Sequence, residues 1–331
     1  MILVTGGAGF IGYHLISALS LEHVVISIDS FSDYYSPELK QLRVKNLKTS
    51  TDVSVTQLDM RNHNELLHYM QKFNIETVIH LAAQPGVRLP ANRFSNYVDS
   101  NIVAFENLLQ ACVQLDVKNV IFASSSSVYG NHAKIPLSEN EVMLRPQSYY
   151  GATKLSNEIT ARVIAERYGM KIFGLRFFTV YGPWGRPDMA YTRVISSLIN
   201  DDEFELFGDG SVVRDFTFVA DVVESIKQLS KLLPKQIEGS FDIFNIGGGK
   251  PISLKRMIEV CESQVGRLLK TVIKSSNPND VRETNADWLK LEGYCGNIPK
   301  TTLADGLRMT IDWALEPEIK LNLRKWIHSV L

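Results

Sequence analysis

Short apolar runs alternate with longer segments of helical spacing over about the first 180 residues. The predicted strands are Met1–Val4, Val24–Ile28, Val53–Leu58, Val78–Leu81, Val120–Ala123 and Lys171–Phe177, and the predicted helices are Phe10–Leu19, Asn64–Phe73, Phe94–Leu115 and Ser148–Tyr168. Strands that alternate with helices in this way form a parallel sheet with helices on both faces. The pattern therefore predicts an α/β fold with a doubly wound parallel sheet.

The alternation loosens from about Thr179 onward, where prolines and glycines mark longer loops. Strand-like runs at Phe204–Phe207, Phe241–Ile246 and Thr271–Lys274 mix there with helical segments at Thr192–Ile199, Val219–Leu232 and Leu254–Val265. We predict a Rossmann domain over residues 1–178 and a smaller, mixed α/β substrate domain over residues 179–331, with some strands returning to the first sheet. A chain of 331 residues fits about two domains.

Composition narrows the class of protein. Thirty-five Lys and Arg face 36 Asp and Glu, and this balance argues against a broad nucleic-acid surface. Three scattered cysteines form neither a disulfide framework nor a zinc motif, so we expect no metal, a reducing compartment and a cytoplasmic protein. The first 21 residues carry no charge. They lack the basic start of a targeting segment, and glycines interrupt them, so they favour a buried strand, turn and helix.

A glycine-rich turn, Gly6-Gly7-Ala8-Gly9-Phe10-Ile11-Gly12, follows the first predicted strand and contains the pattern GxGxxG. Such a turn lets the backbone approach a pyrophosphate, while the helix that follows supplies N–H donors and positive dipole. Asp29 ends the second predicted strand, where its carboxylate can accept both ribose hydroxyls and would repel a 2′-phosphate. The context predicts NAD, bound by residues that include Gly6, Gly9, Phe10, Ile11, Gly12 and Asp29.

Two further groups suggest catalysis. Tyr150 and Lys154 are four residues apart on a predicted helix, so they share one face, and an ammonium beside a phenol would lower the pKa of the phenol. Tyr150 would then serve as a general base. Ser124–Ser127 follows a predicted strand at the sheet edge where ligands bind in such folds. Taken singly, the pair also fits a solvated helix face and the serine run fits a polar turn.

Together, these motifs resemble the extended short-chain dehydrogenase/reductase superfamily and, within it, the nucleotide-sugar epimerases. The resemblance covers nearly the whole chain. It includes His80-Leu81-Ala82-Ala83 after the fourth strand and the Phe207–Gly210 and Arg214–Phe216 segments. Three segments look like those of UDP-glucuronate 4-epimerases, namely Asp29–Tyr35, Gln84–Arg88 and Arg176–Ala190.

The resemblance implies a role for each matching position. Tyr150 would take the proton from the sugar O4, Lys154 would hold the nicotinamide ribose, and Ser125 would share the O4 hydrogen bond. The implied cofactor contacts are Asp59 and Met60 at the adenine, Leu81, Ala82, Ala83 and Ser124 along the cofactor, and Phe177 beside the nicotinamide. The implied substrate contacts are Ser126, Ser127 and Thr179 near the sugar C6, and Arg88, Arg186, Arg214 and Arg282 on the UDP-sugar, with Arg186 and Arg214 facing its UDP portion.

The implied reaction is 4-epimerisation of UDP-glucuronate to UDP-galacturonate through a 4-keto intermediate. A UDP-glucose or UDP-N-acetylglucosamine 4-epimerase, another NAD-dependent UDP-sugar enzyme and a non-catalytic NAD sensor remain as alternatives. Ser126-Ser127 stands where the related dehydratases carry an Asp-Glu pair, which argues against dehydration. Asn277–Asp280 departs from the family's Pro-Gly-Asp segment and lacks the preceding Arg, for which Arg282 is the candidate replacement. The resemblance also implies a homodimer joined by the helices at Phe94–Leu115 and Ser148–Tyr168.

Overall fold

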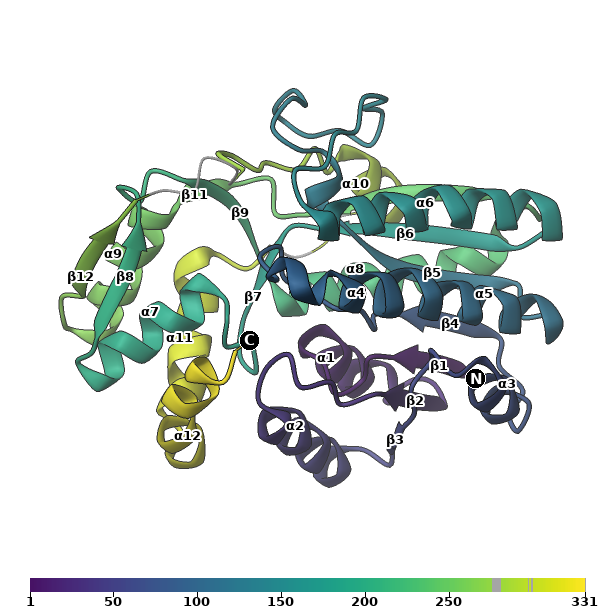
Figure 1. Cartoon of the computed structure of the whole chain (residues 1–331), viewed down its shortest axis with the longest axis horizontal. Coiled ribbons are helices and arrows are strands. Elements are labelled where there is room, and N and C mark those ends of the chain that lie inside the picture. Colours follow the sequence, from purple (N-terminus) through teal and green to yellow (C-terminus); the bar gives the residue numbers. More distant parts are fainter. Residues whose placement is uncertain (276–280, 297, 299, 331) are drawn as a thin grey trace.

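A seven-stranded parallel sheet is the largest element of the computed structural model, which describes residues 1–275, 281–296, 298 and 300–330 (Figure 1). The strand order is β10-β6-β5-β4-β1-β2-β3. Its strands are β1 (Ile2–Thr5), β2 (Val25–Asp29), β3 (Val55–Gln57), β4 (Thr77–His80), β5 (Asn119–Ser125), β6 (Lys171–Phe177) and β10 (Phe241–Ile246). The chain moves outward from β1 in both directions, which confirms the predicted doubly wound sheet.

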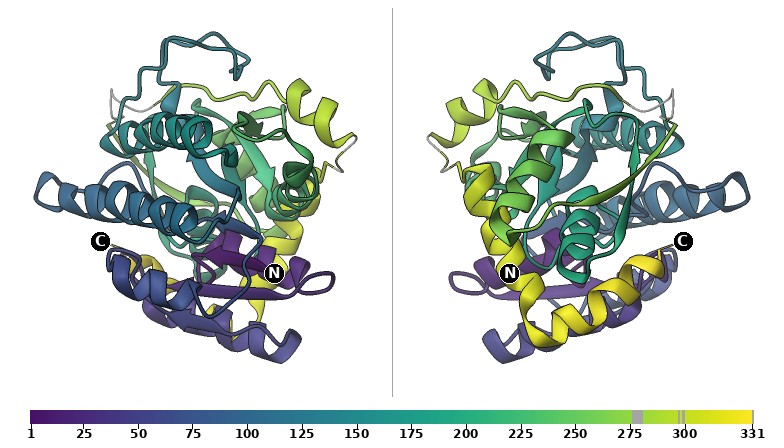
Figure 2. Two further views of the ribbon diagram at one scale, coloured as in Figure 1. Left: turned by 90° about the vertical axis from the view of Figure 1, so that its right-hand side faces the viewer. Right: turned by 90° about the vertical axis from the view of Figure 1, so that its left-hand side faces the viewer.

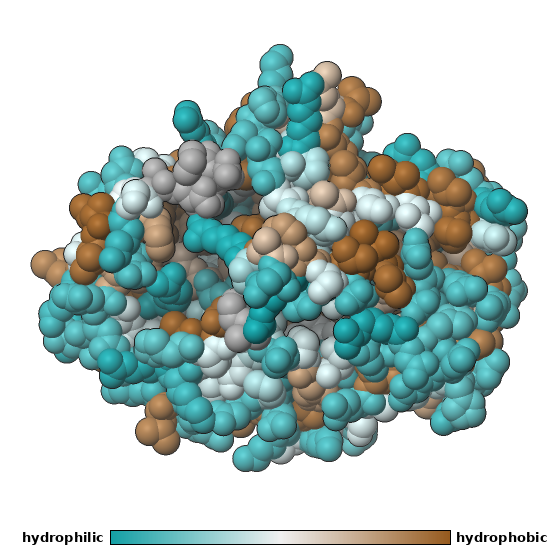
Figure 3. All heavy atoms as spheres, in the orientation of Figure 1, coloured by the Kyte–Doolittle hydropathy of each residue, from teal (hydrophilic) through white to brown (hydrophobic). Residues whose placement is uncertain are grey.

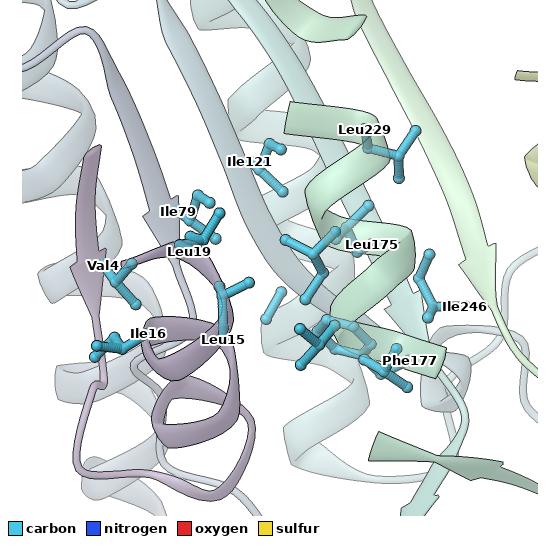
Figure 4. Packing of buried hydrophobic residues seen from close by; sticks show 14 of the residues in the cluster. Val4, Leu15, Ile16, Leu19, Ile79, Ile121, Leu175, Phe177, Leu229 and Ile246 are labelled. Carbon is cyan, nitrogen blue, oxygen red and sulfur yellow. The ribbon is translucent and has the colours of Figure 1, made fainter. Parts of the chain in front are cut away.

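Helices cover both faces of this sheet. Helices α1 (Phe10–Leu19) and α8 (Val219–Leu232) pack on one face, and α3 (His63–Met70), α5 (Ala104–Gln114) and α6 (Tyr149–Tyr168) belong to the other. Figure 4 shows Leu15 and Leu19 of α1 and Leu229 of α8 beside apolar side chains of the strands. All three leucines are fully buried, and each such burial stabilises the fold by about 1.5–3 kcal/mol.

Most of the elements that follow β6 in the chain form a second group beside the carboxyl edge of the main sheet (Figure 1). Strands β11 (Pro251–Ser253), β9 (Val213–Phe218) and β7 (Thr179–Tyr181) make one small sheet, and β12 (Lys270–Lys274) and β8 (Glu203–Phe207) make another. The helices of this group are α7 (Ala190–Asn200), α9 (Leu254–Val265), α11 (Leu303–Leu315) and α12 (Pro317–His328), whereas α10 (Leu289–Cys295) packs against α8 and β10 of the main sheet. As predicted, a strand of the C-terminal half, β10, returns to the main sheet and pairs with β6.

Four α-helices, α2 (Pro37–Ser50), α10, α11 and α12, have no counterpart among the predicted elements. Helix α2 follows β2, and its amphipathic pattern is weak because only four of its residues are buried. Its start does carry a local signal, since Ser36 precedes Pro37 at the first helical position. Helix α12 lies beside α2 (Figure 2), where Lys325 and Trp326 both donate to Glu38. No helix among the described residues is both long and apolar enough to span a membrane.

The stretch predicted as helical over Phe94–Leu115 is helical from Phe94 to Gln114, but its middle is not α-helical. The structure has α4 (Phe94–Tyr97), then π-helical turns over Val98–Val103, then α5. The π segment places Asn101 inside the protein at 1% exposure. Its side chain donates to Gln84 O at 3.2 Å and to Thr153 Oγ1 at 3.1 Å, and it accepts from Gln84 N at 2.7 Å. These bonds tie the loop after β4 to α6, which explains the local departure from α-helical geometry.

Two histidines of this fold are held neutral. Burial lowers the pKa of His14 to about 4 and that of His80 to about 3, with the Lys154 charge adding to the effect at His80. We expect the free energy of unfolding to fall as the pH drops from about 6.5 towards 4, because the unfolded state takes up these protons first. Each histidine contributes up to about 1.4 kcal/mol per pH unit in that window.

Urea denaturation between about pH 7 and 4 measures this dependence. His14→Gln should flatten the slope, whereas His132→Gln, at an exposed position, should leave it as in the wild type. The readout is the slope rather than the absolute stability. An equal slope in His14→Gln and the wild type would contradict the prediction.

Candidate active site

The glycine-rich turn lies between the end of β1 and the start of α1, at the middle of the sheet's carboxyl edge. A Cβ on Gly12 would lie 2.2 Å from Gly6 O, so only glycine lets the helix approach the turn this closely. The helix begins after Gly9 without a side-chain cap. Its first N–H groups and dipole therefore suit an anion such as a dinucleotide pyrophosphate.

Asp29 ends β2 and is buried beside this turn. Its Oδ2 accepts Ala8 N at 3.0 Å, and its Oδ1 accepts Phe31 N at 2.8 Å. These two bonds fix the plane of the carboxylate and leave lone pairs on both oxygens for ribose hydroxyls. The glycine cradle and the oriented acid together fit the predicted NAD.

The other predicted cofactor residues follow the ends of neighbouring strands. Asp59 lies after β3, where the Arg61 guanidinium holds the pKa of its carboxyl below the usual range, and Met60 beside it is buried. Arg61 was not predicted. Half-buried Leu81, Ala82 and Ala83 follow β4, and Leu81 N and Ala82 N donate to Thr5 O and Thr5 Oγ1. Phe177 ends β6.

Tyr150 and Lys154 occupy the first turns of α6, with Ser125 at the end of β5. Lys154 is 1% exposed, and its Nζ lies 5.9 Å from the Tyr150 ring centroid and donates to Ala123 O at 2.9 Å. Ser125 hydrogen-bonds Tyr150. A Cβ at Gly151 would lie 2.7 Å from Ser127 O, so this glycine allows the start of α6 to meet the serine turn. The structure thus brings together the three predicted catalytic residues.

The electrostatics of this group differ from the prediction. Burial raises the pKa of Tyr150, and the opposing effects come from the Arg186 charge and the Ser125 hydrogen bond. Burial also lowers the pKa of Lys154 to about 8. The prediction that Lys154 lowers the pKa of Tyr150 is therefore wrong for this structure, because burial raises that pKa and the groups that oppose the rise are Arg186 and Ser125.

Ser124 belongs to a buried network beneath the site. Its hydroxyl donates to Glu158 Oε1 at 2.5 Å, so this donor is already engaged within the protein. Glu158 also accepts Arg176 Nε at 2.9 Å and Arg176 Nη2 at 2.7 Å. The network joins α6, β5 and β6 next to the predicted catalytic residues.

The predicted sugar-contact residues lie at the adjoining edge. Ser126 and Ser127 are half-buried in a 3₁₀ turn after β5, and Ser127 Oγ accepts the Ser125 hydroxyl at 3.1 Å. Thr179 is half-buried at the start of β7, two residues after Phe177. These hydroxyls follow two adjacent strands of the main sheet, since β5 pairs with β6.

Arg186, predicted on the UDP portion of the substrate, acts electrostatically on Tyr150. Its charge lowers the pKa of Tyr150, and its guanidinium forms a bidentate ion pair with Asp188. Tyr34 OH donates to the same carboxylate at 3.3 Å. Asp188 and Tyr34 thus orient a cation that faces Tyr150; neither was predicted as a site residue.

The other three predicted arginines lie on the second group of elements or face it. The Arg88 guanidinium lies over the Phe207 ring at 5.7 Å. Arg214 on β9 donates to Val213 O at 2.8 Å and to Arg282 O at 3.4 Å. The segment that carries the exposed Arg282 therefore lies beside β9. Asn277–Asp280, where the family motif departs, lies outside the described residues.

Asp215 organises this arginine-bearing region, although it was not predicted as a site residue. It is fully buried and accepts three backbone amides, from Gly248 at 2.7 Å, Gly249 at 2.9 Å and Ala286 at 3.0 Å. The carboxylate therefore holds the β10–β11 loop and the segment after Arg282 against β9. The only sequence signal was its place next to Arg214.

These features define the class of protein: a dinucleotide-binding α/β fold with a Tyr-Lys-Ser group at the carboxyl edge of its sheet. No cluster of His, Cys, Asp or Glu suited to a metal ion occurs among the described residues. Residues 2–247 match the model of the NAD dependent epimerase/dehydratase family. The chain belongs to this family.

Three relatives illustrate the likeness. The chain is 36% identical to a UDP-glucuronate 4-epimerase of Thermodesulfobacterium geofontis, over 95% of this chain and 96% of that one. It resembles the crystal structure of UDP-glucuronic acid 4-epimerase from Bacillus cereus with UDP-glucuronic acid and NAD, at 36% identity and a TM-score of 0.86, covering 94% and 98% of the two chains. A UDP-glucose 4-epimerase structure from Thermotoga maritima with UDP-glucose gives 30% identity and a TM-score of 0.84, covering 94% and 97%.

Proposed function

We propose that the protein catalyses NAD-dependent 4-epimerisation of UDP-glucuronate to UDP-galacturonate through a 4-keto intermediate. The observation that carries the proposal is the meeting of Tyr150, Lys154 and Ser125 at the sheet edge next to the glycine turn and Asp29. Relatives that share 36% identity over nearly the whole chain carry this activity in their names.

Each member of the group has a defined task in this reaction. Tyr150 removes the proton from the sugar O4 and returns it, while Ser125 shares the hydrogen bond to that oxygen. Lys154 holds a ribose hydroxyl and adds positive charge behind the phenol. Bound NAD would supply the reversible hydride chemistry at C4 and a positively charged ring, and the glycine turn and Asp29 would hold it. Arg186 and Ser125 already favour the phenolate.

A carboxylate on the sugar adds a requirement that these residues meet. The 4-keto form of a uronate is a β-keto acid and loses CO₂ readily unless its carboxylate is held out of the reactive orientation. We assign Ser126, Ser127 and Thr179 to this carboxylate as hydrogen-bond donors. Arg186, oriented by Asp188, supplies positive charge at the same end and favours an anionic sugar over a neutral one.

Arg88, Arg214 and Arg282 are our candidates for the uridine diphosphate. These three arginines would neutralise its charge without making the whole surface basic, consistent with the net charge of −1. Within this proposal, residues 1–178 form the cofactor domain and residues 179–331 form the substrate domain. Helix α8 and strand β10 of the second domain pack on the first.

A homodimer completes the proposal. Apolar residues gather over the helices on one side of the molecule (Figure 3). Exposed apolar residues of these helices include Val103, which directly precedes α5, and Ile159 and Val163 on α6. A self-complementary helical face of this kind suits a two-fold interface. We further propose a cytoplasmic enzyme that supplies an activated uronate for polysaccharide biosynthesis.

The proposal is tested by incubating the purified protein separately with UDP-glucuronate and with UDP-glucose and identifying the products by NMR. We expect UDP-galacturonate to accumulate from UDP-glucuronate, without added NAD being consumed and without a UDP-pentose. The hydroxyl groups near C6 would also fit a neutral sugar, so UDP-glucose is the critical comparison. Turnover of UDP-glucose alone would refute the uronate assignment and favour a UDP-glucose 4-epimerase.

A further inference from the structure

Arg43, on α2, is fully buried and connects three distant parts of the chain. Its Nη1 donates to Ala8 O at 2.9 Å and to Tyr35 OH at 2.7 Å. Its Nε and Nη2 donate to Trp184 O at 3.1 and 2.7 Å, and Nη2 also donates to Gly185 O at 3.2 Å. The five bonds match the five N–H groups of a guanidinium.

No carboxylate pairs with Arg43 in the part of the chain that the structure describes. A buried cation without an acid is costly. Hydrogen bonds to polar acceptors and the Tyr35 ring, whose centroid lies 5.5 Å from the guanidinium carbon, compensate it here. A neutral residue could fill the same space without that cost. A neutral residue or a lysine cannot hydrogen-bond Ala8 O and the carbonyls of Trp184 and Gly185 at the same time. Only the planar guanidinium of arginine presents donors toward both groups of acceptors.

One side of this fork belongs to the cofactor turn. Ala8 O accepts Arg43, and Ala8 N donates to Asp29 Oδ2 at 3.0 Å. A single residue of the glycine turn, Ala8, therefore lies between the acid assigned to the NAD ribose and the guanidinium. Ordering of this turn by a bound dinucleotide would act directly on the Arg43 bond.

The other side of the fork holds the loop that carries Arg186. Trp184 adopts a left-handed conformation with φ of +59°, which is unfavourable for a bulky residue and persists only where neighbours hold it. Arg43 binds the carbonyls of Trp184 and Gly185, and His14 of α1 hydrogen-bonds Pro183 O at 2.8 Å. Three consecutive carbonyls are thus held by two residues of the cofactor-binding half.

We infer that Arg43 is a positioning residue that couples occupancy of the dinucleotide turn to the conformation of the Pro183–Asp188 loop and so to the placement of Arg186. The inference rests on the proposed function only for the identity of the ligand at the turn, NAD. Arg43 acts through the loop and does not touch the reacting atoms.

Hydrogen–deuterium exchange of full-length protein, NAD-loaded and after removal of the nucleotide, tests the coupling. In the wild type, NAD should slow amide exchange over residues 183–189 at least about tenfold. In Arg43→Gln and Arg43→Lys the NAD-dependent slowing should be lost, although NAD still binds. Lys45→Gln, an exposed position on the same helix, is the matched control and should behave as the wild type.

The NAD dependence separates coupling from simple stabilisation, which would change exchange equally in both states. Arg43→Lys keeps the positive charge, and it replaces Arg43→Gln in the exchange experiment if that variant does not fold. Wild-type protection in Arg43→Lys, or bound NAD that leaves the wild-type loop unaffected, would overturn the inference. Intact coupling without turnover of any UDP-sugar would refute only the proposed function, and turnover without coupling would refute only this inference.

Discussion

Replacing Tyr150 with Phe should lower kcat by about 10²- to 10⁴-fold while the affinity for NAD and UDP stays within a few-fold of the wild type. The substitution removes one oxygen from a buried side chain and leaves the ring in place. Ser125 then has no phenol to share the O4 proton with, and Lys154 and Arg186 have no phenolate to stabilise. Steady-state rates with UDP-glucuronate give kcat, and calorimetry with UDP gives the binding constant.

The chain offers a matched control in the preceding residue. Tyr149 is 43% exposed, and its ring stacks on Phe94 and Tyr97 at centroid distances of 4.9 and 5.8 Å. Tyr149→Phe keeps that stacking and should retain near wild-type kcat. Equal losses in the two variants would show that removal of either hydroxyl disturbs α6, and full activity in Tyr150→Phe would exclude Tyr150 as the base.

The parts of the site that sequence predicted are those encoded by neighbouring residues. Helix α9 begins and ends as predicted because its apolar spacing is regular, with Ser253 capping its start and Gly266 ending it. The glycine turn and Asp29 were predicted because both the close approach and the acid at the strand end depend on residues within one βαβ unit.

The parts that sequence did not predict depend on contacts between distant segments. Arg43 meets Trp184 across 141 positions, and Asp215 meets Gly248 across 33. A single sequence contains no periodicity that pairs such positions. The shift at Tyr150 was missed for a related reason: the i, i+4 spacing to Lys154 is local, whereas burial and the Arg186 charge arise only in the folded chain.

Contacts between distant segments also fix the position of α6, the helix that carries Tyr150 and Lys154, relative to the main sheet. Tyr150, Lys154 and Glu158 follow one another at four-residue intervals and therefore share a face of α6. Glu158 is the anchor on that face, because its carboxylate receives Ser124 from β5 and Arg176 from β6. The residues next to these partners are Ser125 and Phe177, so the anchor fixes the helix relative to the predicted catalytic serine and the nicotinamide-side strand.

Glu158→Gln should therefore reduce the free energy of unfolding by about 3–5 kcal/mol, because it leaves Arg176 charged, 4% exposed and without its acid. Urea denaturation measures the loss. Removing the acid of the exposed Arg256–Glu259 pair by Glu259→Gln should cost less than about 1 kcal/mol.

Replacing both buried partners, as in Glu158→Leu with Arg176→Met, should give a protein more stable than Glu158→Gln, because no unpaired charge remains. Its kcat should still be low, since apolar packing would not fix α6 over Ser125. A double variant no more stable than Glu158→Gln would show that the cost comes from lost packing rather than from the unpaired guanidinium.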